Sequence, residues 1–363
     1  MRRLNVLALN SGSSSLKFGV YRVDAVGAER LLAETVSTAD VAHAHDRVAS
    51  VLAASGLARP DAIGHRIVHG GAALRAHCRI DATVIEQLQA AAAFAPLHTP
   101  AALAGIAFAQ QHFPGVPQVA CLDTFFHAEL PDVARVLPIA KELRTQGLQR
   151  YGFHGLSLES IVRQLGHPLP DRLIVSHLGN GASVTAVKAG RSVDTSMGLT
   201  PSGGVVMGTR SGDLDPGVLV YLLREMKLDA AGLEALVDHR SGLLGISGLS
   251  GDMRRLHDAE AGNPDARLAI EMFCASVRKQ IAAMIAVLDG LDLLVFTGGI
   301  GENDAAVRAS ICSGLGWIGV GLDAARNRAA SNPLNDAASR CRVQVLASQE
   351  DEQIARHAWA LLA

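Results

Sequence analysis

The stretch LNVLALNSGSSSLK, residues 4–17, joins an apolar run to a turn of small polar residues and a second apolar run. It predicts a strand, a tight turn over Asn10–Ser15 and a returning strand. A similar pattern recurs in LIVSHLGNGASV, residues 173–184, where the turn covers His177–Ser183. Such turns suit phosphate, because glycine allows close backbone approach while N–H groups, hydroxyls and amides act as donors. One such turn is usually an ordinary hairpin, but two in matching positions predict a duplicated fold with phosphates held between its halves.

The composition is that of an ordinary globular protein, with 49% hydrophobic and 19% charged residues among 363. This length is sufficient for two domains, each with its own core. The formal net charge of −2 gives no support for nucleic acid or an anionic membrane as a partner. The apolar runs are shorter than a membrane span, and the run after Arg3 is shorter than that of a secretory signal. The five cysteines form no C-x-x-C pair, so we expect reduced thiols, no zinc site and a cytoplasmic location.

Polar side chains follow the ends of two strands predicted in the first half. Arg66 lies near the end of the run Ala62–His69, before paired glycines, which is typical of a ligand rim. His65 we interpret instead as a buried histidine bonded to a backbone carbonyl. Asp123 follows the predicted strand Pro117–Leu122, and the carboxyl ends of strands are where α/β folds bind ligands. Asp123 is therefore a catalytic or metal-ligating candidate.

The middle of the chain contains a crossing point and a segment of small residues. Tyr151–His154, two aromatic residues and a histidine around a glycine, is interpreted as the crossing between halves. The segment 192–211 could be a flexible linker, but the spacing of Asp194, Arg210 and Asp213 favours a folded binding loop.

A third glycine-rich turn, Thr297–Asn303, follows the apolar strand predicted over Leu291–Phe296 and precedes a helix predicted from Asp304. A strand, a glycine turn and a helix N-terminus form a general nucleotide cradle. The turn matches neither G-x-G-x-x-G nor G-x-x-x-x-G-K-[ST], so the Rossmann and P-loop fingerprints are missing. The longest helix is predicted to begin at Asn263-Pro264 and to end at Gly290, with an apolar stripe that belongs to the core.

Taken together, these stretches resemble the acetate kinase family of the actin, hexokinase and heat-shock ATPase superfamily. The resemblance implies an α/β fold with two domains of duplicated ribonuclease-H-like topology, each a mixed five-stranded sheet flanked by helices, and an interdomain active-site cleft. The implied domains are 1–149 with the helix 352–363, and 150–351; the family normally forms homodimers. Nine blocks occur in the family's order: Leu9–Lys17, Gly64–Gly71, Ala95–Pro100, Asp123–His127, Arg150–Gly155, His177–Ser183, Asp194–Pro201, Met207–Pro216 and Phe296–Asn303.

The resemblance also implies roles for individual residues. The implied catalytic residues are Arg66, Asp123, His154 and Arg210. Asn10 and Glu350 would lie at Mg²⁺, with Mn²⁺ as an alternative ion; for Glu350 a surface ion pair is the competing interpretation. The acyl methyl group would occupy a pocket formed by Val68, Leu97, Phe153 and Pro201. ATP or ADP would contact Asn10, Ser13, Ser15, Lys17, His177, Gly179, Asn180, Gly181, Asp252, Met253, Arg254, Gly299, Ile300, Gly301 and Asn303.

These residue types suit phosphoryl transfer between a carboxylate and ADP. The reaction brings several anionic oxygens together, so catalysis consists mainly of positioning and of charge neutralisation by guanidinium, imidazole and Mg²⁺. The planar arginine fork binds two oxygens at once. A carboxylate is already a nucleophile at pH 7, so no strong general base is needed.

The chain departs from the family pattern at several positions. Pro201-Ser202-Gly203-Gly204 replaces P-L-E-G, Thr99 replaces a common Asn, Leu156 and Leu158 replace Thr and His, and Met253 replaces a frequent Phe. None of these changes removes a residue with an implied chemical role. We therefore expect an acetate kinase with direct in-line transfer, acting on small molecules with neither nucleic acid nor membrane as partner. The alternatives are a propionate kinase and a catalytically idle sensor of acetyl phosphate or nucleotide.

Overall fold

The computed structural model of the protein describes residues 2–12, 15–37, 41–96 and 98–363. The chain forms two compact units. Unit 1 contains Met1–Ala128, Phe153–Arg163 and Gln349–Ala363, and unit 2 contains Glu129–Gly152 and Gln164–Ser348.

Two segments belong to a different unit from the one expected. Residues 129–149 were expected in the first domain, but they belong to unit 2, where Glu129 forms an ion pair with Arg191 at 3.1 Å. Residues 153–163 were expected in the second domain, but Leu156 lies in a core cluster of unit 1.

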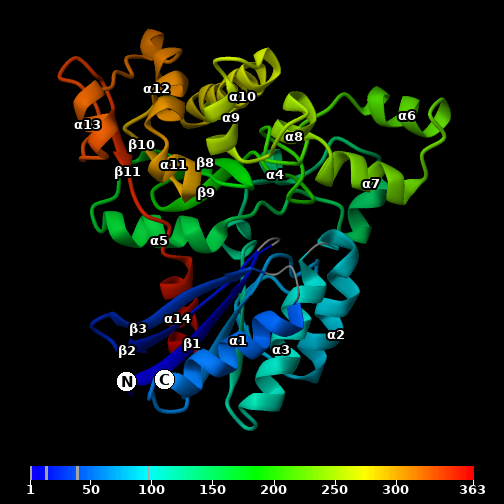
Figure 1. Ribbon diagram of the computed structural model, residues 1–363, viewed down its shortest axis with the longest axis vertical. Helices are drawn as coiled ribbons and strands as arrows, with labels where there is room; N and C mark the ends of the chain where they lie inside the picture. The colour runs from blue at the N-terminus through cyan, green and yellow to red at the C-terminus, as the bar shows by residue number, and fades with distance from the viewer. Residues whose placement is uncertain (1, 13–14, 38–40, 97) are drawn as a thin grey trace. The chain divides into compact units, whose positions relative to one another are not determined.

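Unit 1 is built on a six-stranded mixed sheet in the order β3-β2-β1-β4-β6-β5 (Figure 1). Strands β1, β2 and β3 form an antiparallel meander, while β4 and β6 extend it in parallel. The sixth strand, β5, has only two residues, so the sheet is the expected five strands plus a short edge. The bounds are β1 Leu4–Ser11, β2 Ser15–Val23, β3 Ala28–Ser37, β4 Ala62–Ile67, β5 Cys78–Arg79 and β6 Gln118–Leu122.

The sheet of unit 2 has five strands, in the order β11-β10-β7-β8-β9. Here too a meander of three strands, β7 to β9, is extended by two parallel strands, β10 and β11. The predicted duplication is therefore confirmed, and β1–β2 corresponds to β7–β8. The bounds are β7 Arg172–Leu178, β8 Ala182–Lys188, β9 Arg191–Thr195, β10 Leu293–Thr297 and β11 Arg342–Val345.

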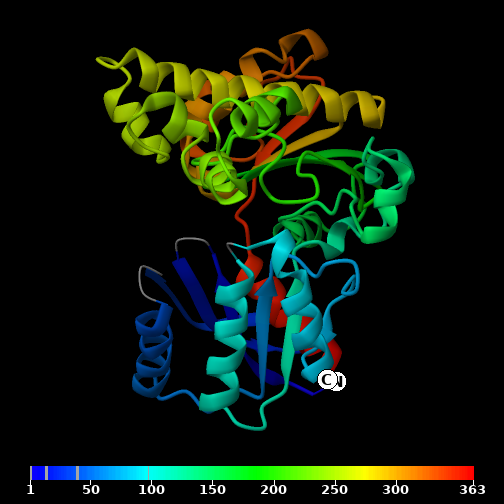
Figure 2. The ribbon, with the colours of Figure 1, turned by 90° about the vertical axis from the view of Figure 1, so that its right-hand side faces the viewer.

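Helices cover both faces of the sheet of unit 1 (Figure 2). Side chains alternate along β1, so Val6 and Ala8 pack against α14 while Leu7 and Leu9 face α1 and α3. Helix α2 is followed directly by a 3₁₀ turn over Ala91–Phe94. The bounds are α1 Val41–Ala54, α2 Ala82–Ala90, α3 Thr99–His112, α5 Gly155–Leu165 and α14 Glu350–Leu362; the last three residues of α5 straddle the boundary of the units.

The long helix α10 packs on the sheet of unit 2, and Asn263 caps its N-terminus as predicted. Its apolar stripe is buried at Phe273, Val277 and Ile281. The turn predicted over 297–303 is itself helical. No helix among the described residues has both the length and the hydropathy to cross a membrane. The bounds are α4 Asp132–Arg135, α6 Pro216–Arg224, α7 Ala230–His239, α8 Gly242–Ser247, α9 Met253–Ala259, α10 Pro264–Leu288, α11 Gly298–Asn303, α12 Ala305–Ser313 and α13 Ala324–Ala329.

Candidate active site

A buried ion pair joins Arg66 and Asp123 in unit 1. Arg66 lies in β4 and Asp123 follows β6, so the two side chains come from the carboxyl ends of neighbouring parallel strands. Arg66 donates to Asp123 Oδ2 through Nη2 at 2.5 Å and through Nε at 2.8 Å. The side chain of Asp123 is 0% exposed. Two of the four residues predicted as catalytic are thus in direct contact.

Burial controls the protonation of this pair. Loss of solvation raises the pKa of Asp123 to about 6; Arg66 opposes this shift, and Glu350 reinforces it. Burial alone would lower the pKa of Arg66, but the surrounding carboxylates raise it well above its usual value, so the guanidinium stays charged. Among the described residues, buried Asp123 Oδ1 has no partner that meets the geometric criteria of a hydrogen bond. The backbone N–H of Leu156 nevertheless lowers the pKa of Asp123.

Asn10 connects this pair to the first turn of α14. Its amide nitrogen lies 3.0 Å from Glu350 Oε2 and 2.8 Å from Asp351 Oδ1, and its oxygen lies 3.4 Å from Arg66 Nη1. Burial raises the pKa of Asp351. Asp351 was not among the predicted site residues, although its place in the acidic run Glu350–Glu352 was a signal that could have found it.

These oxygen atoms are of the type that binds a magnesium ion. Mg²⁺ prefers oxygen ligands and is usually held by one or two carboxylates together with phosphate oxygens and waters. Asp123 offers a buried oxygen without a hydrogen bond, and Glu350 and Asp351 add two further carboxylates at Asn10. The donor set of unit 1 therefore suits a hard divalent cation.

His154 lies directly before α5 in a left-handed conformation, with φ of 61°. This region is costly for a residue other than glycine and is often found at functional sites. The next residue, Gly155, donates its N–H to the Asp123 carbonyl at 2.8 Å, and a Cβ there would lie only 2.2 Å from that oxygen. Glycine at this position therefore lets the backbone carrying His154 approach the backbone of Asp123.

The predicted acyl pocket is described only in part. In unit 1, Val68 and Phe153 are both buried, and the ring of His69 lies 5.5 Å from that of Phe153. Pro201 belongs to unit 2. Leu97, like the phosphate-turn residue Ser13, lies outside the described residues. Ser15 and Lys17 begin β2 opposite the end of β1, with Lys17 paired with Asn10 and exposed.

Two of the predicted phosphate or nucleotide turns lie side by side in unit 2. In the β7–β8 turn, Gly179 donates to the Gly181 carbonyl, and the Asn180 carbonyl accepts from Gly208 at 3.1 Å. A Cβ on Gly179 would lie 3.9 Å from the backbone nitrogen of Gly299, in α11. Gly298 has φ of 76°, and a Cβ there would collide with the carbonyl of the residue before Gly179. The predicted turns at 177–183 and 297–303 therefore adjoin each other, and Gly208 of the block Met207–Pro216 adjoins the first of them.

The other predicted nucleotide residues lie around these turns. Asp252 caps α9 and pairs with Arg254, whose side chain is exposed, whereas Met253 is buried. Asn303 donates its side-chain amide to the Gly299 carbonyl at 2.9 Å. His177, Ile300 and Gly301 belong to β7 and α11. All of these residues belong to unit 2.

The segment 192–211 is folded, so the linker alternative is wrong. Asp213 accepts from the Gly204 N–H at 2.7 Å, and the Asp213 N–H donates to the Gly204 carbonyl at 2.9 Å. Arg210 is 7% exposed and donates from Nη1 to the Pro201 carbonyl at 3.2 Å. These bonds hold the Arg210 guanidinium in a defined place.

His65 is buried, as interpreted from the sequence, but its partner is different. Nε2 lies 2.7 Å from the side-chain oxygen of Gln118, not at a backbone carbonyl. Burial lowers the pKa of His65 to about 4.

Comparison with known proteins places these observations in a family. The family model described as "Acetokinase family" matches residues 24–356. The chain belongs to the Acetokinase family.

Two acetate kinases are similar to this member of the Acetokinase family along most of the chain. The acetate kinase of Thermosynechococcus vestitus is 48% identical over 84% of this chain and 75% of its own length. The acetate kinase of Methylocella silvestris is 40% identical over 98% of each chain.

Solved structures of the Acetokinase family superpose on the whole chain. A propionate kinase from Francisella tularensis has a TM-score of 0.89 at 36% identity and covers 100% of both chains. The acetate kinase of Porphyromonas gingivalis has a TM-score of 0.86 at 32% identity, covering 99% of this chain and 100% of its own. The fold expected from the resemblance is confirmed.

Proposed function

We propose that this chain is an acetate kinase, which transfers the γ-phosphoryl group of ATP to acetate and gives acetyl phosphate and ADP. The observation that carries the proposal is the buried Arg66–Asp123 pair with Asn10 and Glu350 beside it, in a chain of the Acetokinase family. A sensor that only bound nucleotide would have no use for this network, which costs burial of several charges.

The roles proposed for the site residues follow from their chemistry. Arg66 and Arg210 bind the carboxylate and the transferring phosphoryl group through their planar forks. His154 donates a hydrogen bond to that group. Asp123 keeps Arg66 charged and oriented and, with Glu350, provides oxygen ligands for Mg²⁺. The ion, when bound, neutralises charge on the phosphate oxygens. The glycine turns of unit 2 bind ADP through backbone N–H groups.

A hydroxamate assay for acyl phosphate tests the function directly. The purified chain is incubated with ATP, Mg²⁺ and acetate, propionate or butyrate. We expect acyl phosphate from acetate with the highest kcat/KM. A preference for propionate would favour the second candidate, which the structural similarity to the Francisella tularensis propionate kinase supports. Absence of product with every acid, in protein that binds ADP, would favour a sensor.

The transfer is expected to be direct, with inversion at phosphorus. Acetate attacks the γ-phosphorus with a carboxylate oxygen while the bond to the bridging oxygen of ADP breaks, so no side chain needs to be phosphorylated. ATP that is chiral at the γ-phosphate measures this, together with the dependence of the rate on Mg²⁺. Retention of configuration would show two transfers and a phosphoenzyme.

Val68→Ala is expected to raise the kcat/KM for propionate relative to acetate about 10-fold. This is the lower limit of the discrimination that one methylene group gives in an apolar pocket. Val68 is β-branched and buried directly after β4, so it forms a stiff wall that alanine would remove. The assay above measures the ratio. Val48→Ala, a buried valine in α1, is the matched control and should lower stability alone. An unchanged ratio for Val68→Ala would assign Val68 to the core.

We also propose a cytoplasmic homodimer. Helix α6 has no buried residue, and α6 and its flanks expose several large apolar side chains, as a surface for a second copy would. Light scattering of wild type and Tyr221→Asp tests this, and a monomeric wild type would contradict it. The exposed residues are Leu214, Val218, Val220, Tyr221, Leu223 and Met226.

A further inference from the structure

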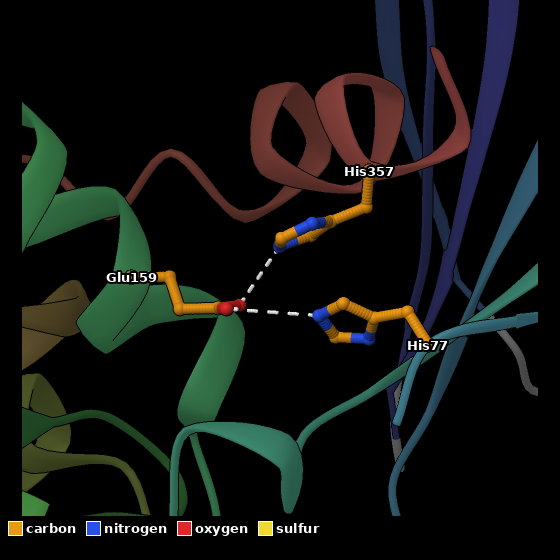
Figure 3. A group of neighbouring side chains, drawn as sticks. All are labelled: His77, Glu159 and His357. Atoms are coloured by element: carbon orange, nitrogen blue, oxygen red, sulfur yellow. Dashed lines mark hydrogen bonds and ion pairs between the residues drawn. The ribbon is translucent and has the colours of Figure 1, made fainter. Parts of the chain in front are cut away.

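A group of three buried or half-buried side chains, the His–Glu–His cluster of His77, Glu159 and His357, lies in unit 1 outside the set of proposed site residues (Figure 3). His77 directly precedes β5, Glu159 lies in α5 and His357 lies in α14. His357 Nε2 is 3.0 Å from Glu159 Oε2, and His77 Nε2 is 3.6 Å from Glu159 Oε1. No sequence signal pairs these residues, because long stretches of chain separate them.

Two imidazoles and a carboxylate within 4.8 Å of one another are also ligand types of a zinc site, but the hydrogen bond on the far side of His77 opposes a metal. His77 Nδ1 accepts from the Leu122 N–H at 2.9 Å, so the proton of the neutral ring is on Nε2. Nε2 is the atom that a metal would need. Histidines that bind metals instead use the other ring nitrogen as a donor. The His77 Nε2–H therefore points at the Glu159 carboxylate.

The cluster holds Glu159 as a charged carboxylate between two nitrogen groups. Burial alone would raise the pKa of Glu159, but His357 and His77 lower it to about 2. Burial lowers the pKa of His77, which stays neutral near pH 7. His357 Nε2 also lies 3.0 Å from the Gln353 amide nitrogen, but donation to a carboxylate is the stronger bond. Glu159 thus accepts a hydrogen bond from His357 and lies 3.6 Å from His77 Nε2, beyond hydrogen-bond distance.

Each member of the cluster is close in the chain to a proposed site residue. Glu159 follows His154 by little more than one helical turn, and His357 lies about two turns after Glu350. His77 accepts from the backbone of Leu122, the residue directly before Asp123. The cluster therefore joins the three segments that carry His154, Asp123 and the acids of α14.

Further polar contacts continue from the cluster along the α5–α14 seam, defined as the facing sides of these helices. Arg163 forms an ion pair with Glu352 at 3.1 Å and donates to Gln353 Oε1 at 3.1 Å. Ser160 accepts from the Gln349 N–H at 3.2 Å. Because Glu159 is the most buried acid of the seam, its carboxylate fixes the relation of the two helices more strongly than an exposed pair would.

We propose that Glu159 is a positioning residue for phosphoryl transfer. Through His357 and His77 it holds the backbone of His154, the end of β6 and the start of α14 in one arrangement, a role that rests on the proposed function. A displacement near 1 Å at a reacting centre can cost about 100-fold in rate. Loss of the Glu159 charge therefore lowers turnover even though the residue contacts neither substrate.

Glu159→Gln, with almost the same volume, tests this proposal. The kcat for acetyl phosphate is expected to fall 10- to 100-fold, with the KM for ATP within twofold, since the nucleotide turns belong to unit 2. Hydrogen exchange should accelerate at the amides of residues 155–163 and 350–357, a result that does not depend on activity. His357→Gln should give the same pattern, and the double variant should be no slower than the slower single variant.

Two controls in unit 1 separate positioning from general stability. Glu34→Gln removes a carboxylate paired with Arg47, and Val48→Ala opens a core cavity; both should keep the wild-type kcat. Three results would overturn the proposal. They are a kcat within twofold of wild type in folded Glu159→Gln, multiplicative effects on kcat in the double variant, and unchanged hydrogen exchange at the amides of the two helices. Stabilisation of wild type but not His77→Asn by Zn²⁺ alone would also overturn it. If Glu159→Gln fails to fold, His357→Gln carries the same test. An inactive wild type would refute the proposed function, and the exchange measurement would still decide the role of Glu159 in the seam.

Discussion

Arg210→Lys is expected to lower kcat by a factor of about 10²–10³. Removing one hydrogen-bond donor that faces the charge developing in a transition state has an effect of this size. The Arg210 side chain is buried and already donates to the Pro201 carbonyl through Nη1, so its other N–H groups have a fixed direction. Lysine keeps the positive charge but cannot span two oxygens of the transferring group. Steady-state kinetics with all substrates saturating measures the loss.

The matched control is Arg278→Lys, because Arg278 also donates to backbone carbonyls in unit 2, those of Ser310 and Ile311, away from the proposed site. We expect Arg278→Lys to lose some stability and little turnover. Near-normal turnover of a folded Arg210→Lys variant would show that only the charge matters at this position.

Asp123→Asn is expected to lower kcat by at least about 10², with a higher Mg²⁺ concentration needed for half-maximal rate. The asparagine keeps the size of the side chain but removes the charge that faces Arg66 and the oxygen proposed for the ion. Removing one partner of a buried pair also costs roughly 3–5 kcal/mol of stability. Thermal unfolding without ligands and a Mg²⁺ titration of the rate separate these two effects.

Asp292→Asn is the control for Asp123→Asn. Asp292 pairs with Arg172 at 2.5 Å in unit 2, so the same chemistry is removed at a partly exposed position outside the proposed site. Its kcat and Mg²⁺ dependence should stay at the wild-type values. An equal effect of both variants, or a normal Mg²⁺ dependence for Asp123→Asn, would contradict the proposed role.

Much of the fold could be predicted from local patterns. The apolar runs on either side of Asn10–Ser15 and His177–Ser183 predicted two antiparallel hairpins, and the cap at Asn263-Pro264 predicted the start of α10. The helix α8 within the glycine-rich stretch 241–251 and the strand β9 after Lys188 were not predicted. In both, tertiary packing outweighs weak local preferences: Leu243 of α8 is buried, and β9 pairs with β8.

The site residues could be predicted only where they form local blocks. Arg66, Asp123 and His154 stand in recognisable segments, whereas Asp351 was missed as a neighbour of Asn10, because that contact joins the two ends of the chain. The His–Glu–His cluster had no signal at all. A pattern in a short stretch of sequence carries no information about which helix faces the sheet brings together. Clusters of residues that are far apart in the chain are therefore seen only in the three-dimensional structure.

Helix α14 determines when unit 1 can complete its fold during synthesis. Ile354, Ala355 and Ala358 of this helix close the core on one face of the first sheet, while Glu350 and Asp351 meet Asn10. During synthesis on a ribosome, the first strands emerge long before this helix, whereas residues 164–348 of unit 2 emerge in one stretch. Unit 1 therefore cannot be finished until α14 has left the exit tunnel. A chain that stalls before Glu350 carries Arg66 and Asp123 without the acids that complete their surroundings.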